Sequence, residues 1–431
     1  MLQSNLARPT NALADFMARF RRTGLVSLLT ANVLIQLLAF LSSLVVAKCL
    51  TLAEFGDVRI LQSYFVFFLI LSGCGFDTAI LRFCALTSGT AQQSQVLRVG
   101  IRRAMVSTAI VFSLLLLSVL TGVLASSSRL NVWIVILGIG LPFAVVTQML
   151  TVFLQAQRRI AEMARIQLLI RLQVFVLVVF STWMWGFPGF VLATVLGYVV
   201  GVLPPFLLIR AERLPTAEGS VPDGFSSMVF FSLLANGVTA LTQAGLFFML
   251  DHSESSREEI GLYSLAMLFV LGASQLTSTV QSIATPYLSA RCQDPVWFRD
   301  RMFRTQFQLA GVSALLAAVL VVAAWCLIEF VYGPEFRPAV GYLCLLLPQF
   351  LLWSSYSVIA AAFLSLGLVH YNLAVGTIAG IVTLGTASML IGGYGVTGVA
   401  LGQLLGALLA ASLTWLLVRP ALKQQQSTGE A

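Results

Sequence analysis

The fold is most clearly encoded in residues 168–209, which read LLIRLQVFVLVVFSTWMWGFPGFVLATVLGYVVGVLPPFLLI. This stretch contains two apolar runs, 168–186 and 189–209, each of about 20 residues, the length that an α-helix needs to cross a bilayer. The sequence Gly186-Phe187-Pro188-Gly189 joins the two runs, and glycine and proline there favour a turn over one continuous helix. We therefore predict two membrane-spanning helices connected by a tight hairpin.

Comparable apolar runs occur along the rest of the chain, at 25–47, 58–81, 104–125, 132–154, 227–250, 261–284, 308–331, 339–365, 371–391 and 395–418. The sequence Gly392-Gly393-Tyr394-Gly395 predicts a second tight turn. The first run is longer than the apolar core of a signal peptide and has no small-residue cleavage site after it, so we expect it to be retained. The sequence predicts an all-α polytopic membrane protein of about twelve transmembrane helices.

The composition supports this fold class, because 58% of the residues are hydrophobic and only 10% are charged. A soluble domain carries roughly 25% charged residues. The six cysteines form no Cys-x-x-Cys pair and the two histidines lie far apart, so the sequence predicts neither a metal site nor a bound cofactor. The net charge of +8 is explained better by orientation in a membrane than by binding of nucleic acid.

Basic residues predict this orientation. When the connections between the predicted helices are assigned to alternate sides, one side receives 20 of the 25 Lys and Arg residues. The other side receives Lys48, Arg59, Arg129, Arg257 and Arg337. Cytoplasmic loops carry an excess of Lys and Arg, so we expect both termini in the cytoplasm and the 251–260 loop outside, in a bacterial inner membrane.

Residues 210–226, which contain Pro215, Gly219, Pro222 and Gly224, divide the chain into two sets of six predicted helices. We expect a cytoplasmic tail at 1–24, one lobe at 25–209, a cytoplasmic linker at 210–226, a second lobe at 227–418 and a cytoplasmic tail at 419–431. Each lobe has an acidic, glycine-bearing connection after its first helix, 54–56 (EFG) and 259–261 (EIG). This echo and the common occurrence of paired six-helix lobes in transporters predict an internal duplication around a central cavity.

Polar residues at helical spacing indicate which faces line that cavity, because polar side chains inside a membrane are costly unless they face protein or water. Ser232, Asn236, Thr239 and Gln243 recur at offsets of three and four residues. The alternative is that such residues join helices by hydrogen bonds. The complete set of predicted cavity or substrate-binding residues is Asn32, Gln36, Arg59, Ser63, Asp77, Arg82, Ser232, Asn236, Thr239, Gln243, Asp251 and Gln275.

Catalytic motifs are missing from the sequence. It contains no Gly-x-x-x-x-Gly-Lys-Ser/Thr loop for nucleotides, no Gly-x-Ser-x-Gly and no His-Glu-x-x-His. No carboxylate lies near the middle of a predicted span, where ion-coupled carriers usually place one. We expect a transporter rather than an enzyme, with its coupling ion left open.

Four segments resemble the polysaccharide flippases of the multidrug/oligosaccharidyl-lipid/polysaccharide exporter superfamily, which translocate O-antigen and exopolysaccharide precursors. They are 44–83 (LVVAKCLTLAEFGDVRILQSYFVFFLILSGCGFDTAILRF), 251–289 with its EEIGLYSLAMLF and TPYLS, 330–340 (FVYGPEFRPAV) and 392–402 (GGYGVTGVALG). The resemblance covers most of the chain. The acidic loop between the seventh and eighth helices and the lack of midplane basic residues depart from the pattern.

The resemblance implies two lobes around a cavity between helices 1, 2, 7 and 8, and a substrate of oligosaccharide on undecaprenyl pyrophosphate. It also implies contacts with membrane lipids and other polysaccharide-assembly membrane proteins. For the anionic head group, we expect Arg82 to capture it and Arg59 to guide it outward; alternatively, Arg82 only follows the positive-inside rule and Arg59 pairs with Glu54 or Asp57. Two other functions stay open, a drug or small-solute antiporter of the same superfamily and a membrane-embedded polysaccharide polymerase or ligase.

Overall fold

The computed structural model describes residues 25–73, 75–86, 89–122, 124–211, 224–289 and 294–429, and these residues contain helices and no strand. The first half of the chain forms α2 (Leu25–Cys49), α3 (Leu52–Gly73), α4 (Phe76–Leu86), α5 (Thr90–Leu120), α6 (Ser128–Gly138), α7 (Leu141–Ala156), α8 (Ile160–Gly201) and α9 (Leu203–Ala211). The second half forms α10 (Phe225–Asp251), α11 (Arg257–Ser289), α12 (Pro295–Leu327), the short turns η1 (Ile328–Tyr332) and η2 (Pro334–Phe336), α13 (Pro338–Ser354), α14 (Ser357–Ser365) and α15 (Val369–Gly429). The predicted tail at 1–24 and most of the predicted linker lie outside the described residues.

The predicted all-α membrane fold is confirmed. Within the described chain, eight helices are long and apolar enough to cross a membrane, or nine if the bent pair α6 and α7 forms one span. The shorter apolar helix Val33–Cys49 corresponds to the first predicted span. The predicted spans all fall on helices, because α8 and α15 each contain two of them. The spans 58–81, 132–154 and 339–365, however, each run across a break into a second helix, α4, α7 and α14 respectively.

Both predicted hairpins are present, in the middle of α8 and of α15. The backbone leaves the helical conformation at Gly186 (φ 61°, ψ −139°) and at Gly395 (φ 52°, ψ −130°). A Cβ on Gly197 would lie 3.0 Å from Val174, and a Cβ on Gly402 would lie 2.8 Å from the backbone nitrogen of Ala387. The two arms of each hairpin therefore run antiparallel in close contact, and glycine at the turn supplies the left-handed φ.

The acidic, glycine-bearing segments are helix starts rather than the connections that the sequence suggested. Helix α3 begins at Leu52, because the Thr51 backbone N–H donates to Glu54 Oε2 at 3.2 Å and the Glu54 N–H donates to Thr51 Oγ1 at 3.3 Å. This reciprocal pair is a capping box. Helix α11 begins in the same way, with the Glu259 N–H donating to Ser256 Oγ at 3.1 Å.

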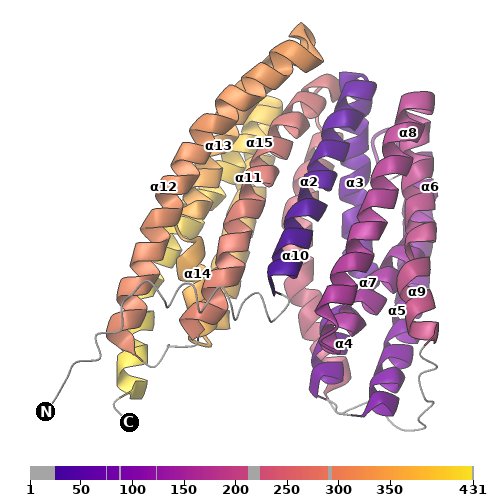
Figure 1. Ribbon diagram of the computed structural model, residues 1–431. Coiled ribbons are helices and arrows are strands. Elements are labelled where there is room, and N and C mark those ends of the chain that lie inside the picture. The colour runs from indigo at the N-terminus through magenta and orange to yellow at the C-terminus, as the bar shows by residue number, and fades with distance from the viewer. Residues whose placement is uncertain are drawn as a thin grey trace, which may run out of the picture.

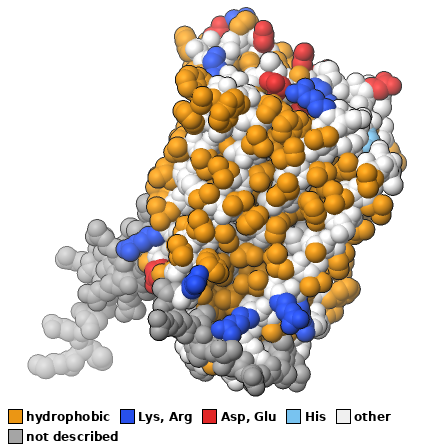
Figure 2. All heavy atoms as spheres, turned by 90° about the vertical axis from the view of Figure 1, so that its right-hand side faces the viewer, with side chains coloured by type: hydrophobic (Ala, Val, Ile, Leu, Met, Phe, Trp, Pro, Cys, Tyr) orange, Lys and Arg blue, Asp and Glu red, His pale blue; other side chains and the backbone are white. Residues whose placement is uncertain are grey.

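Figure 1 shows the helices of the two halves side by side, close together at one end and diverging toward the end at which α15 finishes. We call the end at which the two halves are close together the hairpin end. It contains the turns at 50–51, 186, 252–256 and 395. Figure 2 shows hydrophobic side chains across the middle of the visible face, with Lys and Arg and with Asp and Glu gathered at its two ends. This distribution suits a molecule that crosses a bilayer from end to end.

Helix α10 packs against both halves. Its first residue, Phe225, is buried in a core of first-half residues that includes Ile80 and Phe153. Farther along α10, a Cβ on Gly245 would lie 3.0 Å from Leu384 of α15, in the second half. The predicted lobe of 227–418 is therefore held to the first lobe by its own first helix.

Candidate functional site at the junction of the two halves

The two capped helices cross at the hairpin end through a pair of glycines. A Cβ on Gly56 would lie 2.3 Å from the carbonyl oxygen of Arg257, and a Cβ on Gly261 would lie 2.2 Å from the carbonyl oxygen of Leu52. Arg257 lies one helical turn before Gly261, and Leu52 lies one helical turn before Gly56. Each glycine therefore faces the backbone of the turn that precedes the glycine of the other helix. Any side chain at either position would push α3 and α11 apart, so these glycines allow the two halves to meet backbone to backbone.

Next to this crossing, Asp251 at the end of α10 is buried, with no exposed side-chain surface. Its carboxylate accepts hydrogen bonds from Ser126 Oγ at 2.8 Å, from the Ser126 N–H at 3.2 Å and from the Tyr64 hydroxyl at 3.0 Å. The Tyr64 hydroxyl also contacts the carbonyl oxygen of Leu124. All of these partners belong to the first half, whereas Asp251 belongs to the second.

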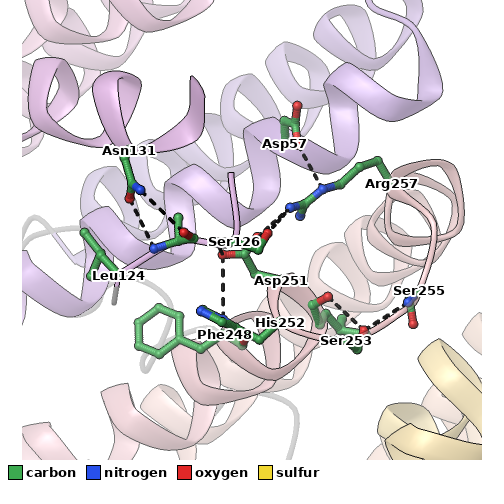
Figure 3. Close-up of polar contacts among 12 residues, drawn as sticks. Asp57, Leu124, Ser126, Asn131, Phe248, Asp251, His252, Ser253, Ser255 and Arg257 are labelled. Atoms are coloured by element: carbon green, nitrogen blue, oxygen red, sulfur yellow. Dashed lines mark hydrogen bonds and ion pairs between the residues drawn. The ribbon is translucent and has the colours of Figure 1, made fainter. Parts of the chain in front are cut away.

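Arg257, at the first residue of α11, balances the charge of Asp251. Its Nη2 lies 2.6 Å from Asp251 Oδ1 and donates to Ser126 Oγ at 2.6 Å, as Figure 3 shows. Its Nε lies 3.5 Å from Asp57 Oδ1 of α3, close enough for an ion pair although the geometry makes no hydrogen bond. We call Asp57, Tyr64, Ser126, Asp251 and Arg257 the junction network.

The junction network fastens the two halves at the hairpin end. Buried charges are costly unless they are paired and hydrogen-bonded. Asp251 is paired with Arg257 inside the second half, but its other hydrogen bonds come from Ser126 and Tyr64 of the first half and exist only while the halves stay together. Separating the halves would leave Asp251 with its second-half neighbours Arg257 and His252 and would remove every first-half partner. The arrangement is therefore stable as a closed contact, and water would have to replace its partners for this end to open.

The polar residues predicted to share one face of α10, which are Ser232, Asn236, Thr239 and Gln243, lie in different surroundings. Ser232 packs against the first half, where a Cβ on Gly75 would lie 2.5 Å from the Ser232 Cβ. Asn236 and Gln243 are exposed. The side chain of Thr239 lies outside the described part of the chain.

On the other predicted cavity helices, Gln36 of α2 is exposed, while Ser63 of α3 and Gln275 of α11 are half-buried. The side chain of Asn32 is outside the described set. Helices α2, α10 and α11 lie where the two halves face each other in Figure 1. Exposed amides on helices in this position are costly in lipid and favourable against water.

Asp77 and Arg82 lie on α4, away from the junction network. Asp77 accepts a hydrogen bond from the Thr78 N–H at 2.7 Å and another from Gln148 Nε2 of α7 at 2.8 Å. Asp77 lies in the first turn of α4 and ties this helix to α7 within the first half. Arg82 is exposed, and its Nη1 donates to Met228 Sδ of α10 at 3.4 Å.

Arg59 takes neither of the partners considered from the sequence. Its Nη1 donates to Gln62 Oε1 at 2.9 Å, and Asp57 pairs with Arg257 instead. Arg59 and Gln62 face a cavity of about 230 Å³ inside the first half, between α2, α3 and α8. This cavity is separate from the junction network.

Sequence reasoning counted Asp251 among the cavity residues and did not identify its partners. Ser126 lies in the connection before α6, far from Asp251 in sequence, and Tyr64 reads as an ordinary aromatic residue of a span. Only Arg257 gave a signal, as a basic residue six positions after Asp251 on the side that is poor in basic residues. In the part of the chain that the structure describes, no group of three or more His, Cys, Asp or Glu side chains could hold a metal ion.

Comparison with known proteins places this geometry in context. A family model described as "Polysaccharide biosynthesis protein" matches residues 22–291. No curated protein matches the sequence. A solved structure described as "Lipid II flippase MurJ, inward closed conformation" is similar with a TM-score of 0.73 at 14% identity, covering 94% of this chain and 90% of that chain.

Transporters of the multidrug resistance MATE family in the MOP superfamily are similar as well. The inward-facing structure gives a TM-score of 0.70 at 14% identity, covering 91% of this chain and 96% of that chain. The outward-facing structure gives a TM-score of 0.68 at 14% identity, covering 94% of this chain and 97% of that chain. At this identity the likeness shows the fold alone, and it favours neither conformation.

Proposed function

Because the chain belongs to the polysaccharide biosynthesis protein family, we propose that it flips a lipid-linked oligosaccharide across a bacterial inner membrane, for assembly of a surface polysaccharide such as O-antigen or exopolysaccharide. The observation that carries this proposal is the pair of halves fastened at one end by the junction network, with exposed amides on the helices between them. The protein makes and breaks no covalent bond in this proposal.

The physical problem in flipping is the sugar. Each hydroxyl that enters hydrocarbon loses its water partners at a cost of several kcal/mol. Side chains such as Gln36, Asn236 and Gln243 offer replacement hydrogen bonds along a path between the halves. The lipid tail stays in the bilayer while the head group, carried on undecaprenyl pyrophosphate, passes through.

Movement of one half against the other exposes this path to each side in turn. In our proposal both termini are cytoplasmic and the hairpin end faces outward, because the basic residues favour the opposite end. With the junction network formed, the path is closed outside. The substrate then enters from the cytoplasmic side, near Arg82.

A deletion strain complemented with variants tests the proposal. Loss of the gene should remove surface polysaccharide and leave the lipid-linked precursor on the cytoplasmic leaflet, and the wild-type gene should restore both. The combined variant Asn236→Leu with Gln243→Leu should insert normally, since leucine suits the membrane, and should restore surface polysaccharide poorly.

The matched control is Phe230→Leu with Phe231→Leu, a pair of exposed apolar residues on the same helix, and it should complement fully. Unchanged surface polysaccharide in the deletion strain, together with greater sensitivity to drugs, would favour a drug antiporter instead. Loss of polymer length with normal flipping would favour a polymerase.

A further inference from the structure

The cavity inside the first half is lined by positive charge without a matching negative charge. Its polar lining residues include Arg59, Gln62, Arg171, Thr194 and Tyr198, and the rest of its wall is mainly apolar. No Asp or Glu lines it. A cavity of about 230 Å³ with two guanidinium groups has the sign and the room for an anion of several heavy atoms.

Arg59 is the group that most needs a partner. It is half-buried, and its Nε is buried without a hydrogen-bond partner. Its Nη1 donates to the neutral side-chain oxygen of Gln62. A buried charge without a counter-charge costs several kcal/mol, so an anion in the cavity would relieve an unfavourable state.

The available donors match an oxyanion. Ser43 and Thr194 already donate their hydroxyl protons to backbone carbonyls, at 3.0 Å and 2.7 Å. The remaining donors are the two guanidinium groups, the amide nitrogen of Gln62 and the hydroxyls of Ser42 and Tyr198. Guanidinium groups bind phosphate oxygens in pairs through their planar fork of N–H groups, which makes phosphate chemistry the best fit.

The two arginines lie at different depths. Arg59 is seven residues along α3 from the hairpin end, and Arg171 is fifteen residues before the turn at Gly186. At 1.5 Å per residue, these positions differ by about 12 Å along the helix axes. Since each arginine side chain can reach several ångströms toward the other, an elongated anion such as a diphosphate can contact both.

Among the described residues, the positions of the second half that correspond to Arg59 and Arg171 form no such site. Ser264, the third residue after Gly261, corresponds to Arg59, the third after Gly56, and it is fully buried. Gly380, fifteen residues before Gly395, corresponds to Arg171. A Cβ on Gly380 would lie 2.6 Å from Thr242 Oγ1 of α10, so the helices there are in direct contact. The helix packing that both halves share therefore requires neither the two arginines nor the cavity between the helices. Only the first half has the arginines and the cavity at these positions.

We propose that this cavity is a binding site for a phosphate-containing anion, held by Arg59 and Arg171. The anion comes either from the head group of a polyprenyl diphosphate lipid or from free inorganic phosphate or diphosphate. The site lies within one half rather than between the two, so the inference goes beyond the proposed function, and binding can be measured without any transport.

The test uses the full-length chain in lipid nanodiscs, with thermal unfolding and titration calorimetry as readouts. One arm adds inorganic diphosphate to nanodiscs of phosphatidylcholine, and the other incorporates undecaprenyl diphosphate. At least one ligand should raise the unfolding midpoint of the wild type. The variant Arg59→Gln should bind that ligand at least tenfold more weakly, and Arg59→Lys should fall between the two.

Arg171→Gln provides a second variant, because Arg171 is exposed and its replacement should leave the fold intact. It should weaken binding as well, whereas Arg102→Gln, an exposed arginine outside the cavity, should bind as the wild type does. A response to inorganic diphosphate identifies a free anion as a ligand; a response to the lipid alone identifies the head group. The proposal is overturned if neither ligand raises the midpoint, or if Arg59→Gln with Arg171→Gln binds as tightly as the wild type.

Discussion

The helix that begins after Thr51 and the helix that begins after Ser256 start in the same way and then differ in their charges. Both have a hydroxyl cap followed three residues later by glutamate, and both present a glycine to the other at the hairpin end. Yet Asp251, five residues before the second cap, corresponds to the buried Val46 of the first half. The Arg59 position likewise corresponds to Ser264.

This comparison separates two kinds of residue. Glycines, caps and hairpin turns recur because both halves need the same helix packing. The charged residues of the junction network and of the first-half cavity occur in one copy only, since a bond between the halves needs unlike partners on its two sides and a ligand site needs to exist only once. We therefore expect substitutions in the repeated framework to act alike in both halves, and substitutions of charges to act in one.

The largest effect on stability should follow from Asp251→Ala. Removing one partner of a buried ion pair costs about 3–5 kcal/mol, and we expect about 3 kcal/mol because Arg257 is partly exposed and keeps Asp57. Thermal unfolding in detergent measures the change. Glu254→Ala, in the adjacent loop, is the control and should leave the midpoint within 1 °C or so, roughly the scatter expected of surface substitutions.

The glycine crossing should respond next. Gly56→Leu and Gly261→Leu each drive a side chain onto a facing backbone carbonyl, and overpacking costs about 1–3 kcal/mol. The same unfolding measurement should give similar losses for the two variants. Gly311→Leu, where a Cβ meets nothing within 4 Å, should be tolerated. Sensitivity at only one of the two glycines would mean that the halves do not share this contact.

A smaller loss of stability, similar in the two halves, is expected for substitutions at the hairpin turns. Gly186→Ala and Gly395→Ala place a Cβ in a backbone conformation that costs roughly 1 kcal/mol or more for other residues. Their unfolding midpoints should fall together, whereas Gly376→Ala, in open space on α15, should not lower it. Tolerance at both turns would show that the arms, rather than the glycines, define the hairpins.

The smallest effect should come from Ser264→Ala, the counterpart of Arg59. The Ser264 hydroxyl is buried without a hydrogen-bond partner, so its removal leaves no other group unpaired and should be neutral or slightly stabilising. Calorimetry should also show diphosphate binding unchanged in this variant. A loss of binding would contradict the assignment of the anion to the first half.

Much of the fold could be predicted from the sequence because the bilayer imposes a simple rule on length and polarity. The spans at 168–186 and 189–209 and their turn at Gly186 followed from that rule, and the resemblance to polysaccharide flippases was confirmed by the family match. The start of α3 was misplaced at residue 58, because the capping box at Thr51 lengthens the helix into the polar segment.

The contacts of single side chains were harder to predict. A stripe such as Ser232, Asn236 and Gln243 defines one face of a helix, but packing decides what that face meets, and here Ser232 contacts the first half while the amides are exposed. Ser126, one of the first-half partners of Asp251, comes from a connection more than a hundred residues earlier. No local pattern contains that information.

The most direct test of the central claim is to fasten the hairpin end and measure flipping. In a cysteine-free background, Ser126→Cys and Asp251→Cys would be joined by a short bifunctional thiol reagent that contains a reducible bond, and the protein reconstituted in liposomes with a fluorescent lipid-linked oligosaccharide. Our account predicts that flipping stops in the cross-linked protein and returns after reduction, relative to the same variant without the reagent. Flipping at an unchanged rate with the link intact would contradict it.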